Sequence, residues 1–235
     1  MSAELRGCLV TGTDTGVGKT VVAAAIVAAL RRRGVAVRAI KPLITGLDDP
    51  PNPDWPPDHQ LLARAAAQDP ADVILAGYGP PVSPHLAAEL AGTPAPTLAW
   101  LADGVRAAGR DGVLTVVEGV GGLLVPLGPD ADVRALARTL ELPLVIAARP
   151  GLGTINHTLL TLEAARSAGL AVCGVVLTPW PGEPSVMERS NRDTIARLGS
   201  VEVATLARVA RAEADLLAEA GAQLPLERWL AAALR

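Results

Sequence analysis

The chain has 235 residues, of which half are hydrophobic, and a formal net charge of −3. This length and composition allow a sizeable buried core, which must be mostly aliphatic because the sequence has no Phe and one Tyr. The weak negative charge argues against a nucleic-acid-binding protein. The sequence shows neither a membrane-spanning apolar run nor a secretory signal segment, so we expect a cytoplasmic protein.

Short apolar runs alternate with helical patterns along the chain. The predicted strands are apolar throughout and cover 8–11, 35–40, 113–117, 144–147 and 172–177. The predicted helices cover 20–33, 98–108, 133–140, 156–167 and 186–198, with two more inside 210–235 around a loop at 221–224. Continuously apolar strands are typical of a parallel sheet with helices on both faces. The sequence therefore predicts a single α/β domain over 1–235 with a doubly wound, mostly parallel sheet.

Several polar or reactive residues have an ordinary structural interpretation. Cys8 and Cys173 lie inside apolar runs, so we expect buried thiols with no disulfide and no zinc site. The segment 48–57 is dense in Asp and Pro and is predicted to be an irregular loop. Ser83 and Pro84 form a typical helix start, as the N-cap and the first helical residue.

A phosphate-binding motif lies between the first predicted strand and the first predicted helix. Its glycines let successive backbone N–H groups face a phosphate, and the helix N-terminus adds partial positive charge. Lys19 can reach the β- and γ-phosphates, and the Thr20 hydroxyl can bind Mg²⁺. The motif predicts an ATP and Mg²⁺ site, where the alternative is an ordinary Gly-rich turn. The nucleotide-binding residues that we assign to it are Thr13, Asp14, Thr15, Gly16, Val17, Gly18, Lys19 and Thr20.

The motif differs from the common P-loop in one respect. Five residues separate Gly12 from Gly18, where the usual spacing is four, and Thr13 stands at the usual first glycine. Partition-type ATPases carry a signature lysine five residues before the motif's lysine, and Asp14 stands there in this chain. A carboxylate cannot neutralise phosphate across a dimer interface, so Asp14 argues against a partition-type switch.

Three more residues could carry chemistry beside this loop. Lys41 is expected at the carboxyl end of the second strand, where α/β sheets bind ligands, and could polarise a phosphoryl or carboxyl oxygen. Glu118 is expected at the end of a later strand as an Mg²⁺ ligand. Asp58 begins a helical pattern and could be either an N-cap or a second Mg²⁺ ligand. The ordinary alternatives for Lys41 and Glu118 are a solvated lysine and a turn acid.

The helix predicted near residue 156 begins with a Gly-rich segment, 151–158. The exposed N–H groups of such a helix start could hold a carboxylate. The structural alternative is that Thr154 or Asn156 only caps the helix.

Taken together, these segments resemble dethiobiotin synthetase, a family of ATP-dependent carboxylases. The matching pieces occur in the family's order and are 12–20, Lys41-Pro42, Thr45-Gly46, 81–85, 117–122 and 153–158. The resemblance implies that CO₂ adds to one amine of 7,8-diaminononanoate to give a carbamate. ATP then phosphorylates the carbamate to a carbamic–phosphoric anhydride, and the second amine closes the ureido ring. It also implies a cytoplasmic homodimer with substrate near the interface, and no nucleic-acid or membrane partner.

The resemblance also implies a role for each matching residue. Lys19 and Lys41 would hold the γ-phosphate and the carbamate, and Thr45, which matches a family Ser, would hydrogen-bond the carbamate. Thr20, Asp58 and Glu118 would hold Mg²⁺. The substrate-binding residues would be Thr45, Gly121, Gly122, Gly153, Thr154, Ile155 and Asn156, and the helix start from Thr154 to Asn156 would come from the partner subunit. Thr178 and Pro179 stand where many family members have an adenine-reading Asn, so the base preference is left open.

Three other functions can be compared with this one. A cobyrinate-type synthetase carries an added glutamine-amidotransferase domain, for which the chain has no room. A partition-type switch is disfavoured by Asp14 and by the lack of a basic amphipathic tail. A catalytically inactive nucleotide-binding module is disfavoured because Lys19, Thr20, Lys41 and Glu118 are all present.

Overall fold

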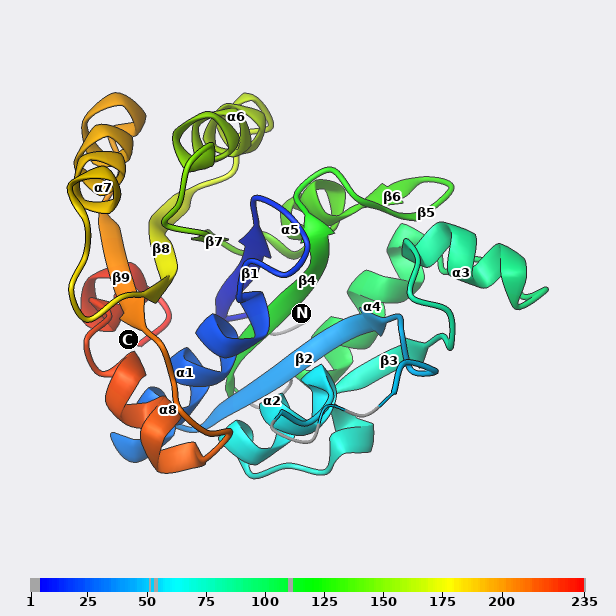
Figure 1. Ribbon diagram of the computed structural model, residues 1–235. Helices are drawn as coiled ribbons and strands as arrows, with labels where there is room; N and C mark the ends of the chain where they lie inside the picture. Colours follow the sequence, from blue (N-terminus) through cyan, green and yellow to red (C-terminus); the bar gives the residue numbers. More distant parts are fainter. Residues whose placement is uncertain (1–4, 51, 53–54, 110–111, 235) are drawn as a thin grey trace.

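The predicted apolar runs form the middle strands of a seven-stranded sheet in the computed structural model, which describes residues 5–50, 52, 55–109 and 112–234 (Figure 1). Neighbouring strands are parallel, in the order β3-β2-β4-β1-β7-β8-β9. The strands are β1 (Gly7–Gly12), β2 (Val37–Ile44), β3 (Ile74–Gly77), β4 (Leu114–Gly122), β7 (Leu144–Ala148), β8 (Val172–Trp180) and β9 (Val203–Ala207). A separate antiparallel pair, β5 (Pro126–Gly128) and β6 (Ala131–Asp132), follows β4 in the chain.

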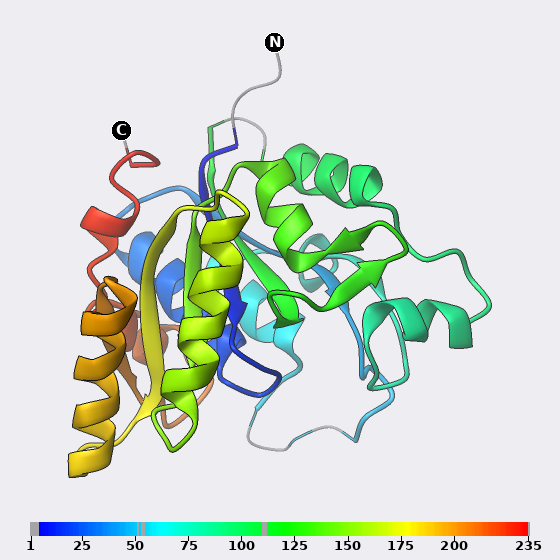
Figure 2. The same ribbon diagram turned by 90° about the horizontal axis from the view of Figure 1, so that it is seen from above.

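Helices cover both faces of the sheet, as Figure 2 shows from above. One hydrophobic core joins α1, α2, α8 and α9 to one face, and a second joins α4, α5, α6 and α7 to the other. Alternate residues of β1 supply both cores, because Cys8 and Val10 belong to the first and Leu9 to the second. This arrangement confirms the doubly wound fold. The helices are α1 (Lys19–Arg32), α2 (Asp58–Ala66), η1 (Pro70–Asp72), α3 (Pro84–Leu90), α4 (Leu98–Ala108), α5 (Val133–Leu140), α6 (Thr154–Ser167), α7 (Val186–Gly199), α8 (Ala214–Gly221) and α9 (Leu226–Trp229).

Two strands continue past the charged residues that the sequence placed at their ends. Lys41 lies inside β2 and Glu118 inside β4, so the prediction that these residues end their strands is wrong. β2 continues because β3 pairs with it, and the Lys41 N–H donates to Val73 O at 2.7 Å. β4 continues beside β1, where Gly122 pairs with Gly12. The glycines that follow Glu118 are therefore strand residues and not a turn.

The register of β2 on β4 brings the two charged residues together. Ile40 pairs with Val117, so Lys41 and Glu118, the next residues of two parallel strands, are neighbours. Strand residues alternate between faces, and Ala39, two residues before Lys41, belongs to the core under α1 and α2. Both charged side chains therefore point to the face that carries the phosphate-loop helix.

Two helix starts test the predicted caps. The N-cap of α2 is Pro57, and Asp58 is the first helical residue. The N-cap interpretation of Asp58 is wrong because its carboxylate accepts a hydrogen bond from Lys41 and does not cap the helix. In α3 the N-cap is Ser83 and Pro84 is the first residue, which confirms the predicted start.

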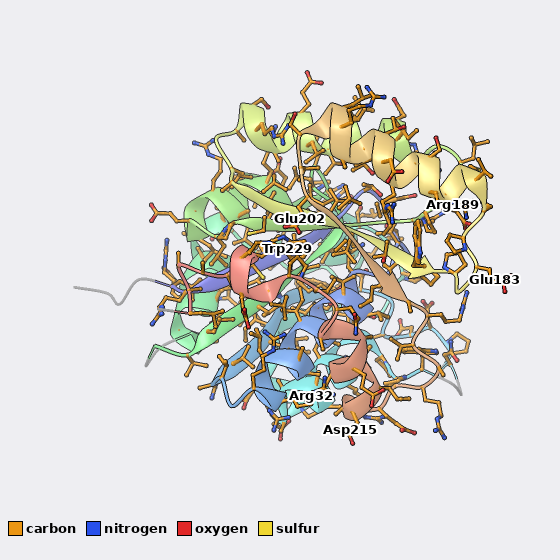
Figure 3. The ribbon with its side chains drawn as sticks, turned by 90° about the vertical axis from the view of Figure 1, so that its left-hand side faces the viewer. Arg32, Glu183, Arg189, Glu202, Asp215 and Trp229 are labelled. Atoms are coloured by element: carbon orange, nitrogen blue, oxygen red, sulfur yellow. The ribbon has the colours of Figure 1, made fainter. Side chains whose placement is uncertain are left out.

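The short last helix, α9, is fastened to the sheet by Trp229. Its ring lies over Gly174 of β8, where a Cβ atom would come within 2.3 Å of Trp229 Cζ2. The indole N–H donates to Glu202 Oε2 at 2.9 Å, and Figure 3 shows these two side chains together at the β9 edge. The C-terminal segment thus closes the core that contains α1.

The burial of the two cysteines agrees with their apolar sequence surroundings. Both are free, and Cys8 is buried while Cys173 is partly buried. Burial raises the pKa of the Cys173 thiol to about 11 and raises that of Cys8 still further, so both thiols are protonated at neutral pH. Within the described ranges, no three His, Cys, Asp or Glu residues gather as a metal-binding group. Searching the same residues for a helix of membrane-spanning length and hydrophobicity also finds none.

The contact between α1 and α8 is unusually close because small residues meet there. A Cβ atom added to Gly221 of α8 would come within 2.0 Å of the backbone oxygen of Ala25 and 3.0 Å of the Ala29 methyl. The close approach of α8 to α1 at Ala25 therefore requires that residue 221 carry no side chain.

We predict that Gly221→Ala lowers the free energy of unfolding by about 1–3 kcal/mol through overpacking. This loss outweighs the helix preference for Ala over Gly, which is about 1 kcal/mol at a helix interior. Urea unfolding measures the change. Gly182→Ala is the matched control, because a Cβ there meets nothing within 4 Å, and it should leave the midpoint unchanged. A Gly221→Ala midpoint equal to that of the unaltered protein contradicts the packing account.

Candidate active site

The phosphate loop joins β1 to α1 and has the backbone shape that its glycines predict. Gly16 and Gly18 have left-handed φ values of 69° and 92°. The Lys19 ammonium donates to Asp14 O at 2.9 Å, so the lysine folds back across the loop. Gly12 has no room for a side chain, because a Cβ would lie 2.8 Å from Val17 Cγ2. The loop backbone is therefore tightly curved, as a loop that binds phosphate through its N–H groups must be.

A group of charged and polar side chains, of which two are buried and two partly exposed, lies beside the loop. The Lys41 ammonium donates to Asp58 Oδ2 at 2.6 Å and to Glu118 Oε1 at 2.7 Å. The Thr20 hydroxyl donates to the same Glu118 oxygen at 2.8 Å. These four side chains come from β2, α2, β4 and α1, and we call them the Lys41 cluster. Lys41 and Glu118 are only 4% and 1% exposed.

Burial and mutual attraction set the charges in the cluster. Burial alone would lower the pKa of Lys41, but the carboxylates of Glu118 and Asp58 outweigh it and hold that pKa above its ordinary value. Burial is the largest single influence on Asp58 and would raise its pKa, but the charge and hydrogen bond of Lys41, together with Thr20 and Lys19, lower the pKa below its ordinary value. For Glu118 burial dominates and raises the pKa, although Lys41 opposes the shift. We assign Glu118 as ionised because its Oε1 lies 2.7 Å from the Lys41 ammonium.

The cluster fits a hard divalent cation. The second oxygen of Glu118, Oε2, is buried and has no hydrogen-bond partner among the described residues. A buried acceptor without a partner is costly, so it marks a position for a ligand. Carboxylate and hydroxyl oxygens are the donors that Mg²⁺ prefers. Thr20, Asp58 and Glu118 supply such oxygens around one point.

The loop and the Lys41 cluster open into one cavity of about 790 Å³, a size that suits a nucleotide-scale ligand. The predicted site residues that line it are Thr15, Gly16, Gly18, Lys19, Thr20, Lys41, Thr45, Asp58, Glu118 and Gly121. The structure thus gathers the predicted catalytic and metal-binding residues from four separate segments.

Apart from the start of α6, six predicted residues do not line the cavity, and Asp14 among them is exposed on the loop. Val17 is buried against Gly12, and Gly122 pairs with Gly12, so both support the loop from behind. Thr13 donates its N–H to Ala147 O at 3.0 Å, which ties the loop to β7. Thr178 contacts the loop directly, since a Cβ on Gly18 would meet its methyl group at 2.8 Å. Pro179 follows it through a cis peptide bond and is exposed.

The predicted carboxylate-binding helix start lies away from this cavity. Gly153 is the N-cap of α6, with a left-handed φ of 89°, so neither Thr154 nor Asn156 caps the helix. Gly153 and Asn156 are exposed, Ile155 is partly buried, and Thr154 is buried with its hydroxyl 3.5 Å from that of Thr158. None of the four predicted residues lines the cavity formed by the described part of the same chain.

Two residues that the sequence interpretation missed hold the loops of the site. Arg149 follows β7 and donates to Thr15 O at 2.9 Å, with Asp14 Oδ2 3.4 Å away. Arg149 could have been predicted from the sequence, because it is a basic residue directly after a buried strand, where α/β sheets bind ligands. Asn191 of α7 is buried and donates from Nδ2 to the carbonyl oxygens of Pro150 and Gly151, at 2.9 and 3.2 Å. No local pattern identifies Asn191, because its partners lie about forty residues earlier.

A third missed signal is compositional. The sequence has only two lysines, Lys19 and Lys41, and every other basic side chain that is permanently charged is an arginine. Both lysines are buried, at 7% and 4% exposure, and both line the cavity. A lysine ammonium is a compact charge that can exchange between anionic partners, whereas an arginine binds as a planar fork. The chain thus keeps lysine only at this site.

Comparison with solved structures supports the fold. A cobyrinic acid a,c-diamide synthase from Mycobacterium smegmatis, with bound ATP analogue and magnesium, has a TM-score of 0.56 at 17% identity and covers 95% of each chain. The apo McdA protein has a TM-score of 0.54 at 14% identity, covering 98% of this chain and 100% of that one. Similarity at this level of identity concerns the fold alone.

Comparison of sequences identifies the family. A family model described as an AAA domain matches residues 6–213. The ATP-dependent dethiobiotin synthetase BioD of Mycobacterium sp. (strain KMS) is 44% identical over 199 residues, covering 83% of this chain and 85% of that protein. The enzyme of the same name from Rhodococcus jostii (strain RHA1) is 43% identical over 196 residues, covering 83% of each. The resemblance drawn from the motifs is thereby confirmed, and the chain belongs to the family of ATP-dependent dethiobiotin synthetases.

Proposed function

We propose that this chain uses ATP and Mg²⁺ to carboxylate 7,8-diaminononanoate and close the product to dethiobiotin. The observation that carries the proposal is the Lys41 cluster, which shares one cavity with the phosphate loop and Thr45. Phosphoryl transfer needs mainly positioning and neutralisation of charge. Two lysines and a set of oxygen ligands beside a preformed phosphate cradle supply both.

The first step joins CO₂ to one amine of the substrate, which loses a proton and becomes a carbamate. Lys41 would bind the carbamate oxygen, and the Thr45 hydroxyl would donate a hydrogen bond to it. Both residues line the same cavity as Lys19, which supports a single reaction site. Fixing the anionic carbamate next to the γ-phosphate converts a rare encounter into a reaction within one complex.

The second step transfers the γ-phosphoryl group of ATP to the carbamate, giving the carbamic–phosphoric anhydride and ADP. The N–H groups of the loop 13–20 that have no partner among the described residues would cradle the phosphates, and Lys19 would neutralise the γ-phosphate. Thr20, Asp58 and Glu118 would hold Mg²⁺, which supplies neutralisation of the phosphate oxygens when bound. The second amine then attacks the anhydride carbon, which forms the ureido ring and expels phosphate.

The remaining predicted residues divide between the two substrates. Gly121 and Gly122 would border the diamine, and Gly121 lines the cavity. Thr178 and Pro179 would border the nucleotide base, a role supported by the contact of Thr178 with Gly18. Thr178 has no carboxamide with which to read adenine in the manner of the family Asn.

We also propose a homodimer in which α6 of one subunit completes the site of the other. The N–H groups at Gly153, Thr154, Ile155 and Asn156 would bind the substrate carboxylate. Two observations support this arrangement. The start of α6 lies outside the cavity of its own chain, and the neighbouring Leu152 is 92% exposed, as expected for a residue that another surface covers.

One assay tests the proposed reaction. Purified protein with MgATP, bicarbonate and the diamine should release ADP only when the diamine is present, with dethiobiotin formed in equal amount. ATP turnover that is indifferent to the diamine contradicts the proposal.

We predict that Lys41→Ala lowers kcat by about 10²–10³-fold, because it removes a charge aimed at the phosphoryl acceptor. The folded state should survive, as judged by circular dichroism in the presence of Mg²⁺. Arg197→Gln, on the exposed end of α7, serves as the control and should keep full activity. Unchanged turnover in Lys41→Ala removes Lys41 from the reaction.

Asn191 gives a prediction about the carboxylate-binding helix start. Asn191→Asp sets a carboxylate against the carbonyl oxygens of Pro150 and Gly151 and so displaces the loop before α6. We expect kcat/KM for the diamine to fall about tenfold or more, while the KM for ATP stays constant. Equal changes for both substrates would show that Asn191 acts on general stability and not on this loop.

A further inference from the structure

The Lys41 cluster holds a cation at the point where the proposed function needs a metal. The Lys41 ammonium lies between Asp58 Oδ2 and Glu118 Oε1, at 2.6 and 2.7 Å. These are the two carboxylates that would bind Mg²⁺ with Thr20. The Thr20 hydroxyl also donates to Glu118 Oε1, so all three metal-binding groups are engaged in one network around Lys41.

The geometry does not allow the ammonium and a metal ion to share these two oxygens. Mg–O distances are about 2.0–2.1 Å, shorter than the N–O distances of 2.6 and 2.7 Å in the cluster. Two oxygens that bind one Mg²⁺ must therefore close on the ion, and no space remains between them for Nζ. Glu118 Oε2 is open to a ligand, but Lys41 has to leave Asp58 Oδ2 or Glu118 Oε1 before that oxygen can bind metal.

The charges explain when this exchange is favourable. When all four are ionised, the charges of Lys19, Lys41, Glu118 and the partly exposed Asp58 cancel, so this group of side chains is neutral without ligands. A divalent cation alone would leave this group with excess positive charge beside the buried Lys41 ammonium. A nucleotide brings the compensating negative charge and offers the phosphate oxygens as new partners for the displaced ammonium.

We propose that Lys41 is the resident counter-ion of the metal site, and that it is released to the reacting phosphate and carbamate only when Mg²⁺ and nucleotide are both bound. The inference rests on the proposed function for the position of the metal. Its consequence is an order of events: the ammonium that activates the acceptor becomes available only after the metal has taken over its carboxylates.

The scarcity of lysine makes this exchange directly observable. With ¹⁵N-labelled lysine, the unaltered protein should give two side-chain ammonium signals, one from Lys19 and one from Lys41. Lys41→Arg assigns the signals by losing one, and Lys19→Arg assigns them by elimination if Lys41→Arg does not fold.

We expect the Lys41 signal to keep its position with Mg²⁺ alone and with ADP plus EDTA, and to shift with Mg²⁺ and ADP together. Two results overturn the proposal: a Lys41 signal that MgADP leaves in place, and a full shift produced by ADP without metal. The assay for dethiobiotin is independent of these spectra. A positive assay with an unmoved Lys41 signal removes the exchange alone, and a negative assay with the expected shift removes only the reaction.

Metal titration gives a second test. In the absence of nucleotide, Lys41→Met should bind Mn²⁺ at least about tenfold more tightly than the unaltered protein, because a competing unit charge a few ångströms away is gone. Lys41→Met/Glu118→Gln should lose that gain. Equal Mn²⁺ affinity for Lys41→Met and the unaltered protein contradicts the counter-ion role. If Lys41→Met is unfolded without metal, recovery of its thermal transition by Mn²⁺ measures the same preference, and no recovery counts against the proposal.

Discussion

The site depends on one constraint, which is that a buried ammonium must be paired. Lys41 and Glu118 are almost fully buried, and neither charge would be stable there without the other. Their contact in turn requires the register of β2 on β4, which makes them neighbours in adjacent strands, and the start of α2, which supplies Asp58. The same few contacts therefore stabilise this half of the fold and position the charged groups of the cavity.

The other half of the molecule supports the site through loops. β7 and β8 end beside the phosphate loop, where Arg149 donates to Thr15 O and Thr178 packs against Gly18. Asn191 of α7 holds the loop that leads into α6, so the exposed start of that helix has a fixed backbone. In the proposed homodimer, the start of α6 would bind the carboxylate of the substrate in the partner subunit's site. Both amines of that substrate would then be free to enter the cavity.

The sequence predicted the features that depend on local pattern. The β1 strand, the glycines of the phosphate loop and the helix over Val133–Leu140 all have strong short-range signals. It did not predict the edge strands β3 and β9, because each is only four or five residues long and contains Ala or Gly, which have a weak preference for strands. Lys41 and Glu118 were assigned to strand ends because charge and glycine normally stop a strand, whereas here pairing with β3 and β1 continues it. Asn191 could not be found, since its partners are distant in sequence.

In the proposed reaction a carbamate oxygen that comes from CO₂ becomes bonded to phosphorus. That oxygen must therefore leave with the phosphate. The direct test uses bicarbonate labelled with heavy oxygen, together with the diamine and MgATP, in a reaction short enough to limit exchange of CO₂ with water. Mass spectrometry of the released phosphate should find one heavy oxygen per dethiobiotin formed. Dethiobiotin accompanied by phosphate without heavy oxygen would contradict the claim, because the carbamate oxygen would then never have been bonded to phosphorus.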